Sequence, residues 1–463
     1  MTVFPWTAKQ VAEALGMPAL SWDHAYTGVS TDTRALQDGE LFVALQGERF
    51  DAHHFLGDAR LAGVGGAVVR HGTTAWPGFD AFEVDDTLDA LGRLARYRRD
   101  RFEGPVIAIT GSTGKTSTKE LIAAALSPKY RVHKSESNLN NLVGVPLTVL
   151  AAPVDATAMV VECGASLPGE LARIRAIVRP TIAVVTTVGA AHLEGFGGLD
   201  AVMEEKTSLL DGAETAIVGT QPAALPGRAR ARAARVVTAG AAGGADWVAE
   251  GVTLLEDARP RFRVRGVEIT LGRGVRGRHM VDNALIALAV ADAAGVPLAE
   301  AAPALENATI PGGRSEVVEI EGVTVVNDCY NANPQSLRAA VDLLGALRGE
   351  RRAIAVVGTM RELGSDAERL HREAAEAVLA AKPDLVVAIG EFEKAFQAVE
   401  RRTSNVKRST VEVISGPTPE AVAPALKERL REGDVMLLKA SRGVQLEKLI
   451  PMLWPDHAAA EAH

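Results

Sequence analysis

The chain has 463 residues, of which 47% are hydrophobic and 23% charged, and its formal net charge is −8. This composition is that of a globular protein and excludes disordered and fibrous classes, while the length predicts roughly three domains. Phosphate-backbone binding needs clustered Lys and Arg, so the acidic balance argues against a nucleic-acid partner.

Residues 1–84 are predicted to form a small α/β domain. Short strand-like segments, such as Leu41–Ala44 and Gly66–Val69, alternate there with short helical ones. The next segment is a predicted helix with leucines at helical spacing beside a basic run, residues 93–101. We interpret the charges of this run as a solvated helix face.

Residues 85–314 are predicted to form a central domain. An apolar strand, Pro105–Thr110, runs into a glycine loop and a helix from about Thr116. Further strands, with helices between them, are predicted at Ala158–Val161, Ile182–Val188 and Ala216–Val218. This alternation predicts a mostly parallel sheet with helices on both faces. From Trp247 to Thr270 the period changes to two, which predicts an antiparallel β insertion.

Residues 315–463 are predicted to form a third domain of Rossmann-like α/β topology. Its strands and helices are expected at Val323–Asn327, Gln335–Leu347, Ala353–Gly358, Ala367–Ala381, Leu385–Ile389 and Val435–Lys439. Gly358 and Gly390 follow the apolar parts of two strands, at the sheet edge where open α/β sheets bind ligands. The sequence therefore predicts a three-domain α/β protein.

The two cysteines, Cys163 and Cys329, lie in apolar strand-like runs, where a free thiol packs as a small hydrophobic group. No apolar stretch approaches the ~18 residues that span a bilayer, and no basic segment followed by an apolar one opens the sequence. We expect a cytoplasmic protein with no membrane partner.

The strongest chemical signal is Gly111-Ser-Thr-Gly-Lys-Thr116, which lies between a predicted strand and a predicted helix. Glycines let backbone N–H groups face a phosphate, the helix N-terminus adds a positive field, and Lys115 reaches the terminal phosphates. The loop is shorter than the usual form, because Ile109 stands where a glycine is common. The predicted ATP-binding residues of this P-loop are Gly111, Ser112, Thr113, Gly114, Lys115, Thr116 and Ser117. The alternative is an accidental glycine-rich turn.

Two more polar side chains are predicted at the same edge of the central sheet. Glu162 ends one apolar run and His192 follows another. A carboxylate beside a phosphate loop suits Mg²⁺, and an imidazole could be a second ligand. The alternatives are a capping or salt-bridged glutamate and an ordinary histidine. Lys206, further along, reads from the sequence alone as an exposed lysine on a helix.

Polar residues also gather where the third domain begins. Asn327–Pro334 follows a predicted strand, which favours ligand contacts or, alternatively, a hydrogen-bonded turn. Pro311–Glu316 lies at the predicted boundary between the second and third domains. Arg314 in this segment could clamp a phosphate at a hinge, or the segment could be a plain linker.

Taken in order, these segments resemble the Mur ligase family, the ATP-dependent enzymes that add amino acids to the nucleotide-linked precursor of bacterial peptidoglycan. The resemblance covers nearly the whole chain. Besides the phosphate loop it rests on Ser137–Asn141, Gly144–Pro146, Glu162, Gly189–Phe196, Lys206, Asn283–Leu285, Gly313–Arg314, Asp328–Pro334 and Lys439–Arg442. It implies an N-terminal domain for the UDP-sugar, a central ATPase and a third domain for the amine substrate.

The resemblance also implies roles for individual residues. ATP contacts would come from the loop and from Asn283, Arg314, Asp328, Tyr330 and Asn331. The UDP-sugar would contact Ser30, Asp32, Arg34, Gln46, Asn138 and Asn141. Two Mg²⁺ ions would be held by Thr116, Glu162, His192 and Lys206. The catalytic residues would be Lys115, His192, Lys206 and Arg314.

By the same resemblance, Lys206 would carry a carbamate derived from CO₂, which turns a cation into an anion able to bind the second Mg²⁺. Carbamylation requires the neutral amine, so the resemblance implies a lowered pKa for Lys206.

Segments of the third domain separate the members of the family. Asp328–Pro334, Gly358–Gly364 and His371–Glu373 look like those of members that add D-alanyl-D-alanine to UDP-N-acetylmuramoyl-tripeptide, forming ADP through an acyl phosphate. The Tyr-Ala-His and Asp-Asn-Pro-Arg signatures usual in members that add the third residue are absent from this sequence. In the first domain, Ser30–Arg34 and Phe42–Gly47 resemble the uridine-site segments of both kinds of member.

We therefore expect a monomeric, ADP-forming ligase that acts on these two substrates. The alternatives are a sister ligase that adds the third amino acid, a folate polyglutamate-forming relative, and a non-catalytic ATP-binding regulator.

Overall fold

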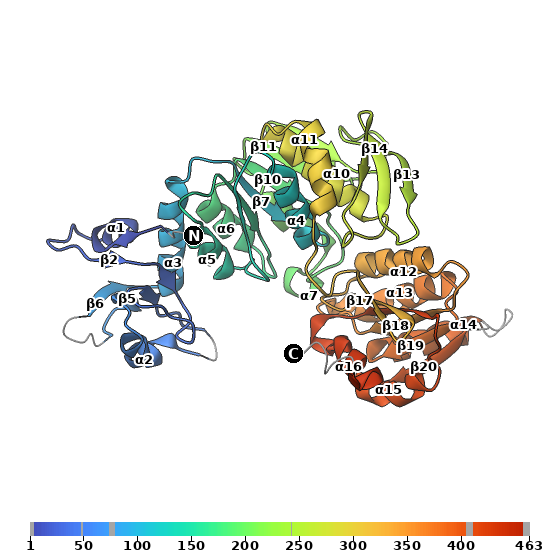
Figure 1. The fold of residues 1–463 in the computed structure, drawn as a ribbon. Helices are drawn as coiled ribbons and strands as arrows, with labels where there is room; N and C mark the ends of the chain where they lie inside the picture. Colours follow the sequence, from blue (N-terminus) through green and yellow to red (C-terminus); the bar gives the residue numbers. More distant parts are fainter. Residues whose placement is uncertain (1–3, 48–49, 74–78, 242, 404–410, 457–463) are drawn as a thin grey trace.

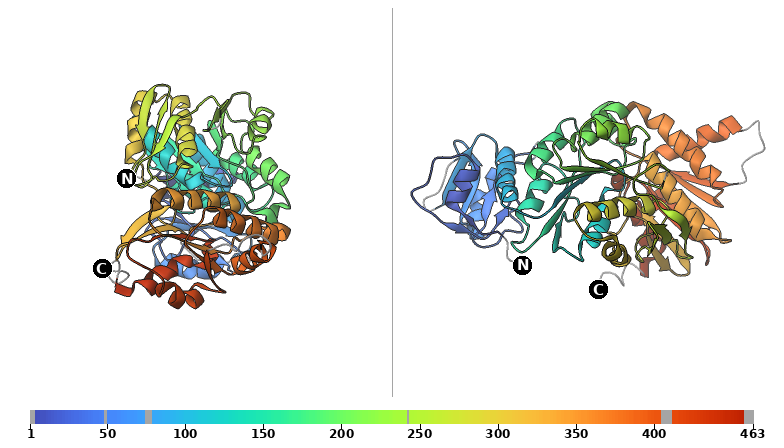
Figure 2. Two further views of the ribbon diagram at one scale, coloured as in Figure 1. Left: turned by 90° about the vertical axis from the view of Figure 1, so that its right-hand side faces the viewer. Right: turned by 90° about the horizontal axis from the view of Figure 1, so that it is seen from above.

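The structure, a computed structural model, describes residues 4–47, 50–73, 79–241, 243–403 and 411–456. Its three α/β bodies follow one another along the chain, with the central body between the other two (Figures 1 and 2), so the predicted fold class is confirmed. Each sheet falls within one predicted domain range, while the boundaries at 84/85 and 314/315 remain predictions. Within the described ranges, no helix is both long and apolar enough to cross a bilayer.

The N-terminal body contains a parallel sheet with strand order β3-β4-β5-β6 and a small antiparallel pair, β1-β2. The elements are β1 (Trp6–Thr7), α1 (Ala8–Ala14), β2 (Ala25–Tyr26), β3 (Val29–Ser30), β4 (Leu41–Val43), α2 (Leu56–Leu61), β5 (Gly66–Arg70) and β6 (Asp80–Val84). Successive residues of β4 point to opposite faces, and both faces are buried: Phe42 joins one apolar cluster, while Leu41 and Val43 join another.

The central body is a parallel sheet with strand order β12-β11-β10-β7-β9-β8. Its strands are β7 (Val106–Thr110), β8 (Val132–Lys134), β9 (Ala158–Glu162), β10 (Ile182–Val185), β11 (Thr215–Gly219) and β12 (Val236–Ala239). Its helices are α4 (Lys115–Leu126), α5 (Gly144–Leu150), α6 (Glu170–Val178), α7 (Leu193–Phe196), α8 (Leu199–Ser208), α9 (Leu225–Arg230), α10 (Met280–Ala293) and α11 (Leu298–Ala304).

Alternating residues of β7 explain the layers of this body. Ile107 and Ile109 pack in the cluster that contains α4 and α10, and Val106 and Ala108 pack in the cluster that contains α5 and α6. The predicted parallel sheet with helices on both faces is therefore confirmed. The edge strands β8 and β12 were not predicted, and β10 ends at Val185 rather than at residue 188.

The predicted antiparallel insertion is also confirmed. It is a sheet of β13 (Glu250–Leu254), β14 (Pro260–Val264) and β15 (Val267–Thr270), in that order. Phe262 and Ile269 turn the apolar face of this sheet toward the cluster of α10.

The helix α3 (Thr87–Asp100) joins the first two bodies, and part of its basic run was interpreted wrongly. Arg98 is only 4% exposed and donates to a carbonyl just beyond α5. Arg96 and Arg99 donate to carbonyls in the last turn of α6. The unsatisfied carbonyls of a helix C-terminus attract cations, so these guanidinium groups bind neighbouring helices instead of facing water.

The third body has strand order β16-β17-β21-β18-β19-β20, with β16 antiparallel and the others parallel. Its strands are β16 (Glu316–Ile320), β17 (Val323–Asp328), β18 (Ala353–Gly358), β19 (Leu385–Ile389), β20 (Glu412–Gly416) and β21 (Val435–Lys439). Its helices are α12 (Pro334–Arg348), α13 (Ala367–Ala380), α14 (Glu391–Thr403), α15 (Pro419–Lys427) and α16 (Leu449–Leu453). Edge strands β16 and β20 were not predicted.

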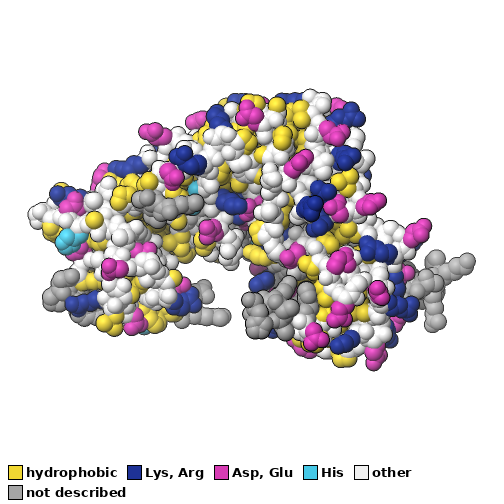
Figure 3. All heavy atoms as spheres, viewed as in Figure 1, with side chains coloured by type: hydrophobic (Ala, Val, Ile, Leu, Met, Phe, Trp, Pro, Cys, Tyr) yellow, Lys and Arg dark blue, Asp and Glu magenta, His cyan; other side chains and the backbone are white. Residues whose placement is uncertain are grey.

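The third body meets the central one near the short helix α7, which packs against a 3₁₀ turn of the third body, Gly364–Asp366. On the face drawn in Figure 3, acidic and basic side chains are interspersed over all three bodies. Contacts of α7 with this 3₁₀ turn therefore form part of the joint between the last two bodies.

Leu94 tests the role of α3 in holding the first two bodies together. Its side chain is fully buried, so Leu94→Ala should lower the free energy of unfolding by about 2–5 kcal/mol, as measured by urea unfolding. The control is Leu61→Ala in α2, whose side chain is 88% exposed and whose loss should change stability by no more than ~0.5 kcal/mol. Equal effects of the two substitutions would contradict this packing.

Candidate active site

The phosphate loop connects β7 to α4 and needs both of its glycines. Gly114 has φ +79°, and a Cβ there would lie 2.8 Å from the Asn283 side-chain oxygen. A Cβ on Gly111 would lie 1.9 Å from the hydroxyl oxygen of Thr186. The loop is therefore pressed against its neighbours, and its N–H groups are directed by backbone conformations that only glycine adopts readily.

Lys115 opens α4 and folds back over the loop, where its Nζ donates to the Gly111 carbonyl at 2.7 Å. Burial lowers the pKa of Lys115, and the nearby Arg314 charge lowers it further, against the opposing effect of Glu162. A buried cation beside a glycine loop attracts phosphate strongly, because little water screens its charge.

Glu162 lies where it was predicted, at the end of β9 and beside the loop. Its side chain is 2% exposed. One carboxylate oxygen accepts from the Thr116 hydroxyl at 2.8 Å, and the other accepts from the Asn140 amide at 2.9 Å. Asn140 was missed as a site residue, although the asparagine-rich segment that contains it was noticed.

The segment after β10 forms one wall of the loop. The Ser112 hydroxyl donates to the Gly189 carbonyl and accepts from the Gly189 N–H. The Thr113 carbonyl accepts from the Thr186 hydroxyl at 2.6 Å, and the hydroxyl groups of Thr113 and Thr187 lie 2.9 Å apart. Thr186 and Thr187, which were predicted to belong to this strand, hydrogen-bond to the loop instead, and β10 therefore ends at Val185.

Arg314, in the segment between the central body and β16, reaches the loop. Its guanidinium donates to the Thr116 hydroxyl at 2.9 Å and stacks 3.4 Å above the Tyr330 ring centroid. The Asn333 amide, which was not predicted, donates to the Ser112 carbonyl at 3.4 Å. The structure therefore brings Arg314 to the phosphate loop, with Tyr330 stacked beneath it.

Asp328 and Asn331, also predicted ATP contacts, are tied to Lys439 instead of to the loop. Lys439 is 2% exposed; its Nζ lies 2.8 Å from an Asp328 carboxylate oxygen and donates to the Asn331 carbonyl at 2.6 Å. The other Asp328 oxygen accepts from the Ser315 N–H at 3.2 Å. This network fixes the backbone on either side of Tyr330.

Lys206 is not the exposed lysine that the sequence alone suggested. It lies on the inner face of α8, is 1% exposed, and donates to the Ala165 carbonyl at 3.3 Å. Burial lowers the pKa of Lys206 to about 7, and the Lys115 charge acts in the same direction. Its amine is thus partly neutral near neutral pH, as the family resemblance implied.

His192 is paired with Glu362, which was not predicted as a site residue, although it lies in the segment Gly358–Gly364 that the family resemblance singled out. Its Nδ1 lies 2.5 Å from a carboxylate oxygen of Glu362 in the third body. The close approach of His192 lowers the pKa of Glu362 below its usual range. Of the described residues, only Thr116 and Asn140 supply side-chain hydrogen bonds to Glu162, so His192 and Lys206 do not contact it directly.

The residues predicted to bind the UDP-sugar lie in two groups. The Arg34 guanidinium donates to both oxygens of Asp32, which lowers the pKa of Asp32 to about 2, and the Ser30 hydroxyl accepts from the Asp32 N–H. Gln46 accepts from Arg70 at 2.6 Å.

Before α5, Asn141 caps the helix by accepting from the Gly144 N–H at 2.8 Å, and Asn138 contributes a carbonyl to the same loop. Strand β3 touches α5, so the two groups are neighbours.

The predicted Mg²⁺ ligands were tested against the donor atoms that are present. Among the described residues, no three His, Cys, Asp or Glu side chains converge as a metal site. The Thr116 hydroxyl and Glu162 carboxylate are hard oxygen donors held together. Mg²⁺ is commonly bound by one or two carboxylates with phosphate oxygens and water, so this pair fits an ion that arrives with a nucleotide.

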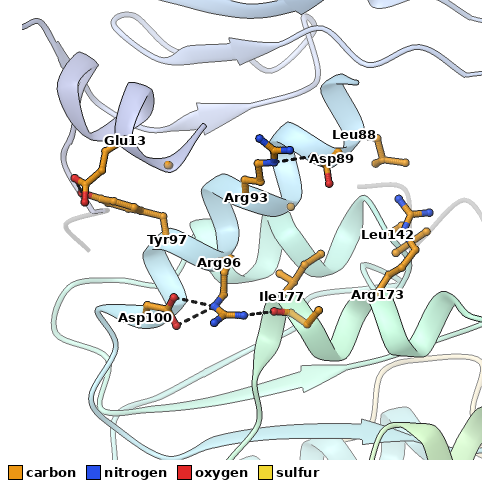
Figure 4. A pocket seen from close by; sticks show the side chains of 13 residues that line it. Glu13, Leu88, Asp89, Arg93, Arg96, Tyr97, Asp100, Leu142, Arg173 and Ile177 are labelled. Carbon is orange, nitrogen blue, oxygen red and sulfur yellow. Dashed lines mark hydrogen bonds and ion pairs between the residues drawn. The ribbon is translucent and has the colours of Figure 1, made fainter. Parts of the chain in front are cut away.

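A cavity of about 440 Å³ lies elsewhere, between α1, α3 and α6 (Figure 4). Paired side chains, Arg93 with Asp89 and Arg96 with Asp100, line its wall. None of the predicted site residues lines this cavity, so it is not part of the phosphate site.

Known proteins are similar to this chain along almost its full length. Residues 109–291 match the Mur ligase middle domain, and residues 313–442 match the domain described as Mur ligase, glutamate ligase domain. The chain is 34% identical to the UDP-N-acetylmuramoyl-tripeptide–D-alanyl-D-alanine ligase of Bacillus subtilis, over 96% of this chain and 97% of the relative.

Solved structures of MurF ligases also match almost the whole chain. MurF from Acinetobacter baumannii matches with a TM-score of 0.87 and 30% identity, covering 98% of this chain and 99% of that one. The MurF ligase from Thermotoga maritima in complex with ADP matches with a TM-score of 0.81 and 28% identity, covering 94% and 98%.

Gly114 offers a direct test of the loop. An alanine at φ +79° against Asn283 must displace the loop or the amide, so Gly114→Ala should weaken ADP binding about tenfold or more in calorimetry. The matched control is Gly72→Ala, which has the same φ, +79°, with nothing within 4 Å of the added carbon. Equal ADP affinity in both variants would show that the loop does not hold the nucleotide.

Proposed function

The chain belongs to the Mur ligase family, and we propose on that basis that it joins D-alanyl-D-alanine to UDP-N-acetylmuramoyl-tripeptide while ATP becomes ADP and phosphate. Full-length similarity to ligases of that name carries the proposal. The hydrogen-bonded chain Arg314–Thr116–Glu162 supports it, since it places a cation and a carboxylate at a phosphate loop.

In the first half of the reaction, the terminal carboxylate of the tripeptide attacks the γ-phosphorus of ATP, and the bond to ADP breaks. Negative charge concentrates on the transferred group, so catalysis depends on positioned positive charge. Lys115 lies over the loop, and Arg314 reaches it from the segment that joins the central and third domains. Mg²⁺ bound with ATP supplies further neutralisation, and Thr116 and Glu162 are the side chains that would hold it.

In the second half, the amine of D-alanyl-D-alanine attacks the carbonyl carbon of the acyl phosphate, a C–N bond forms, and phosphate leaves. Water competes with the amine for this intermediate. Asn333 brings the third domain directly onto the loop, and Arg314 joins it there, so closure of this joint would shield the intermediate from water.

The sugar nucleotide is proposed to bind along the junction of the first two domains. Ser30, Asp32, Arg34 and Gln46 on one side and Asn138 and Asn141 on the other are the proposed contacts. The side chain of Arg34 is 88% exposed and is oriented by its pairing with Asp32, so the guanidinium N–H groups that Asp32 does not bind are open to a diphosphate.

Lys206 is proposed to carry a carbamate that, with His192, holds the second Mg²⁺. The neutral amine would attack CO₂ and lose one proton, which would leave a carbamate anion in place of the neutral amine. The lowered pKa and near-complete burial of Lys206 support this proposal.

The substrate pair is tested by ADP release. The enzyme should release ADP with UDP-N-acetylmuramoyl-tripeptide plus D-alanyl-D-alanine, and not with UDP-N-acetylmuramoyl-dipeptide plus a diamino acid. Turnover of only the second pair would identify a sister ligase. Nucleotide binding without product from either pair would favour a regulator.

The carbamate is tested by ¹³C NMR after incubation with labelled bicarbonate. The amine of Lys206 is neutral above its pKa of about 7 and protonated below it, so the carbamate signal should grow as the pH rises through 7. Lys206→Arg, which keeps the charge but cannot be modified, should lack the signal. A spectrum unchanged by this substitution would assign the carbamate elsewhere.

A further inference from the structure

One carboxylate of the third domain crosses the domain joint and meets the central domain. Glu362 lies between β18 and α13, and its carboxylate lies 2.5 Å from His192 Nδ1. The Glu362 carbonyl accepts from the Glu194 N–H at 3.2 Å, at the start of α7. His192 follows closely after Gly189, which hydrogen-bonds to Ser112 of the phosphate loop. Glu362 is therefore presented beside the wall of the loop.

Both members of this pair have strained backbones. His192 has φ +54° and Glu362 has φ +63°, a left-handed conformation that costs a residue with a Cβ free energy. Such conformations persist where the surroundings impose them, and they gather at functional sites. The two residues face each other across the domain joint, so the surroundings of each must hold its backbone in this conformation.

The surroundings of Glu362 explain how the strain is maintained. The preceding residue, Arg361, donates from its N–H to the Ser441 hydroxyl and from its guanidinium to the Gly443 carbonyl. His371 accepts from the Met360 N–H through Nε2, and its Nδ1 lies 2.7 Å from the Ala367 carbonyl. His371 thus acts as a positioning residue for the segment that presents Glu362.

The Glu362 carboxylate still has capacity for a ligand. Its side chain is 55% exposed, and among the described residues His192 is its only ion-pair partner, at one oxygen. Two other third-domain carboxylates near the joint have internal partners. Asp328 is bound by Lys439 and the Ser315 N–H, and Glu316 accepts from the Gly313 N–H and the Asn327 amide.

The incoming D-alanyl-D-alanine carries an ammonium group at neutral pH. To attack the acyl phosphate, this nitrogen must be placed at the joint between the phosphate loop and the third domain and must there lose a proton to become the neutral amine. An ammonium binds most strongly to a carboxylate that is fixed in position and is not already neutralised at both oxygens.

We propose that Glu362 binds the ammonium group of D-alanyl-D-alanine and places its nitrogen against the phosphate loop. This inference rests on the proposed function and assigns one of its substrate contacts. Glu362 is a binding residue of the second half-reaction, and the first half-reaction does not need it.

The test uses Glu362→Gln in the full-length enzyme, with the half-reactions separated. Loss of a charged hydrogen bond should raise the KM for D-alanyl-D-alanine about tenfold to a hundredfold and leave the KM for ATP and for the tripeptide unchanged. Hydroxylamine, a small amine that is uncharged at neutral pH, captures the acyl phosphate as a hydroxamate. The variant should form hydroxamate at the wild-type rate, and Glu362→Asp should recover part of the dipeptide affinity.

The control is Glu194→Gln, a neighbouring exposed acid on α7, which should keep the wild-type KM. An unchanged dipeptide KM in Glu362→Gln would overturn the proposal. An equal rise of the dipeptide KM in Glu194→Gln would also overturn it, because the effect would then come from the general negative charge of this surface. A comparable loss of hydroxamate formation in Glu362→Gln would overturn it too, because it would indicate a structural role. Product formation by the wild type reports on the proposed function, and the ratio of variant to wild type reports on Glu362, so the two failures are distinguishable.

Discussion

The hydroxyl of Thr116 connects the phosphate loop to the two side chains on which the proposed site depends. It donates to Glu162 on the neighbouring strand and accepts from Arg314, which lies just before β16, the first strand of the third body. Lys115 lies next to it in sequence, and its charge in turn lowers the pKa of the buried Lys206. Lys115 and Arg314 beside the single carboxylate of Glu162 leave an excess of positive charge that is unfavourable without an anion. Bound triphosphate supplies that anion and thereby favours the arrangement in which the third domain contacts the central one.

The first and third domains are attached to the central domain by different kinds of contact. The helix α3 binds the first domain firmly to the central one, because Leu94 is buried and Arg96 and Arg99 cap α6. At the phosphate site, the third domain is attached by polar contacts, such as Arg314 with Thr116 and His192 with Glu362. Polar contacts can be exchanged for contacts with substrate at little cost, so this joint is suited to a reaction that must admit two substrates and exclude water.

The features predicted correctly from the sequence are local ones. The phosphate loop was found because its glycines and lysine are contiguous and lie between a buried strand and a helix. Glu162 was placed correctly because apolar strands of a parallel sheet end at a common edge. The alternation that revealed the strands also gave the layers, and only weakly apolar edge strands such as β8 and β16 were missed.

What the sequence could not show are contacts between distant segments. Lys206 looked exposed because its own helix has charged neighbours, and it is buried because of what α8 packs against. Arg98 looked solvated for the same reason. The segments that contain Asn140, Asn333 and Glu362 were noticed, but the individual residues were not, since their partners lie in other elements or in another domain.

The most direct test is a crystal structure with a non-hydrolysable ATP analogue and Mg²⁺. The account predicts that Lys115 leaves the Gly111 carbonyl for the terminal phosphates, that Thr116 and Glu162 bind the metal, and that Arg314 contacts the phosphate chain. Phosphates bound elsewhere, with Lys115 still on Gly111 and Glu162 turned away from the metal, would contradict it.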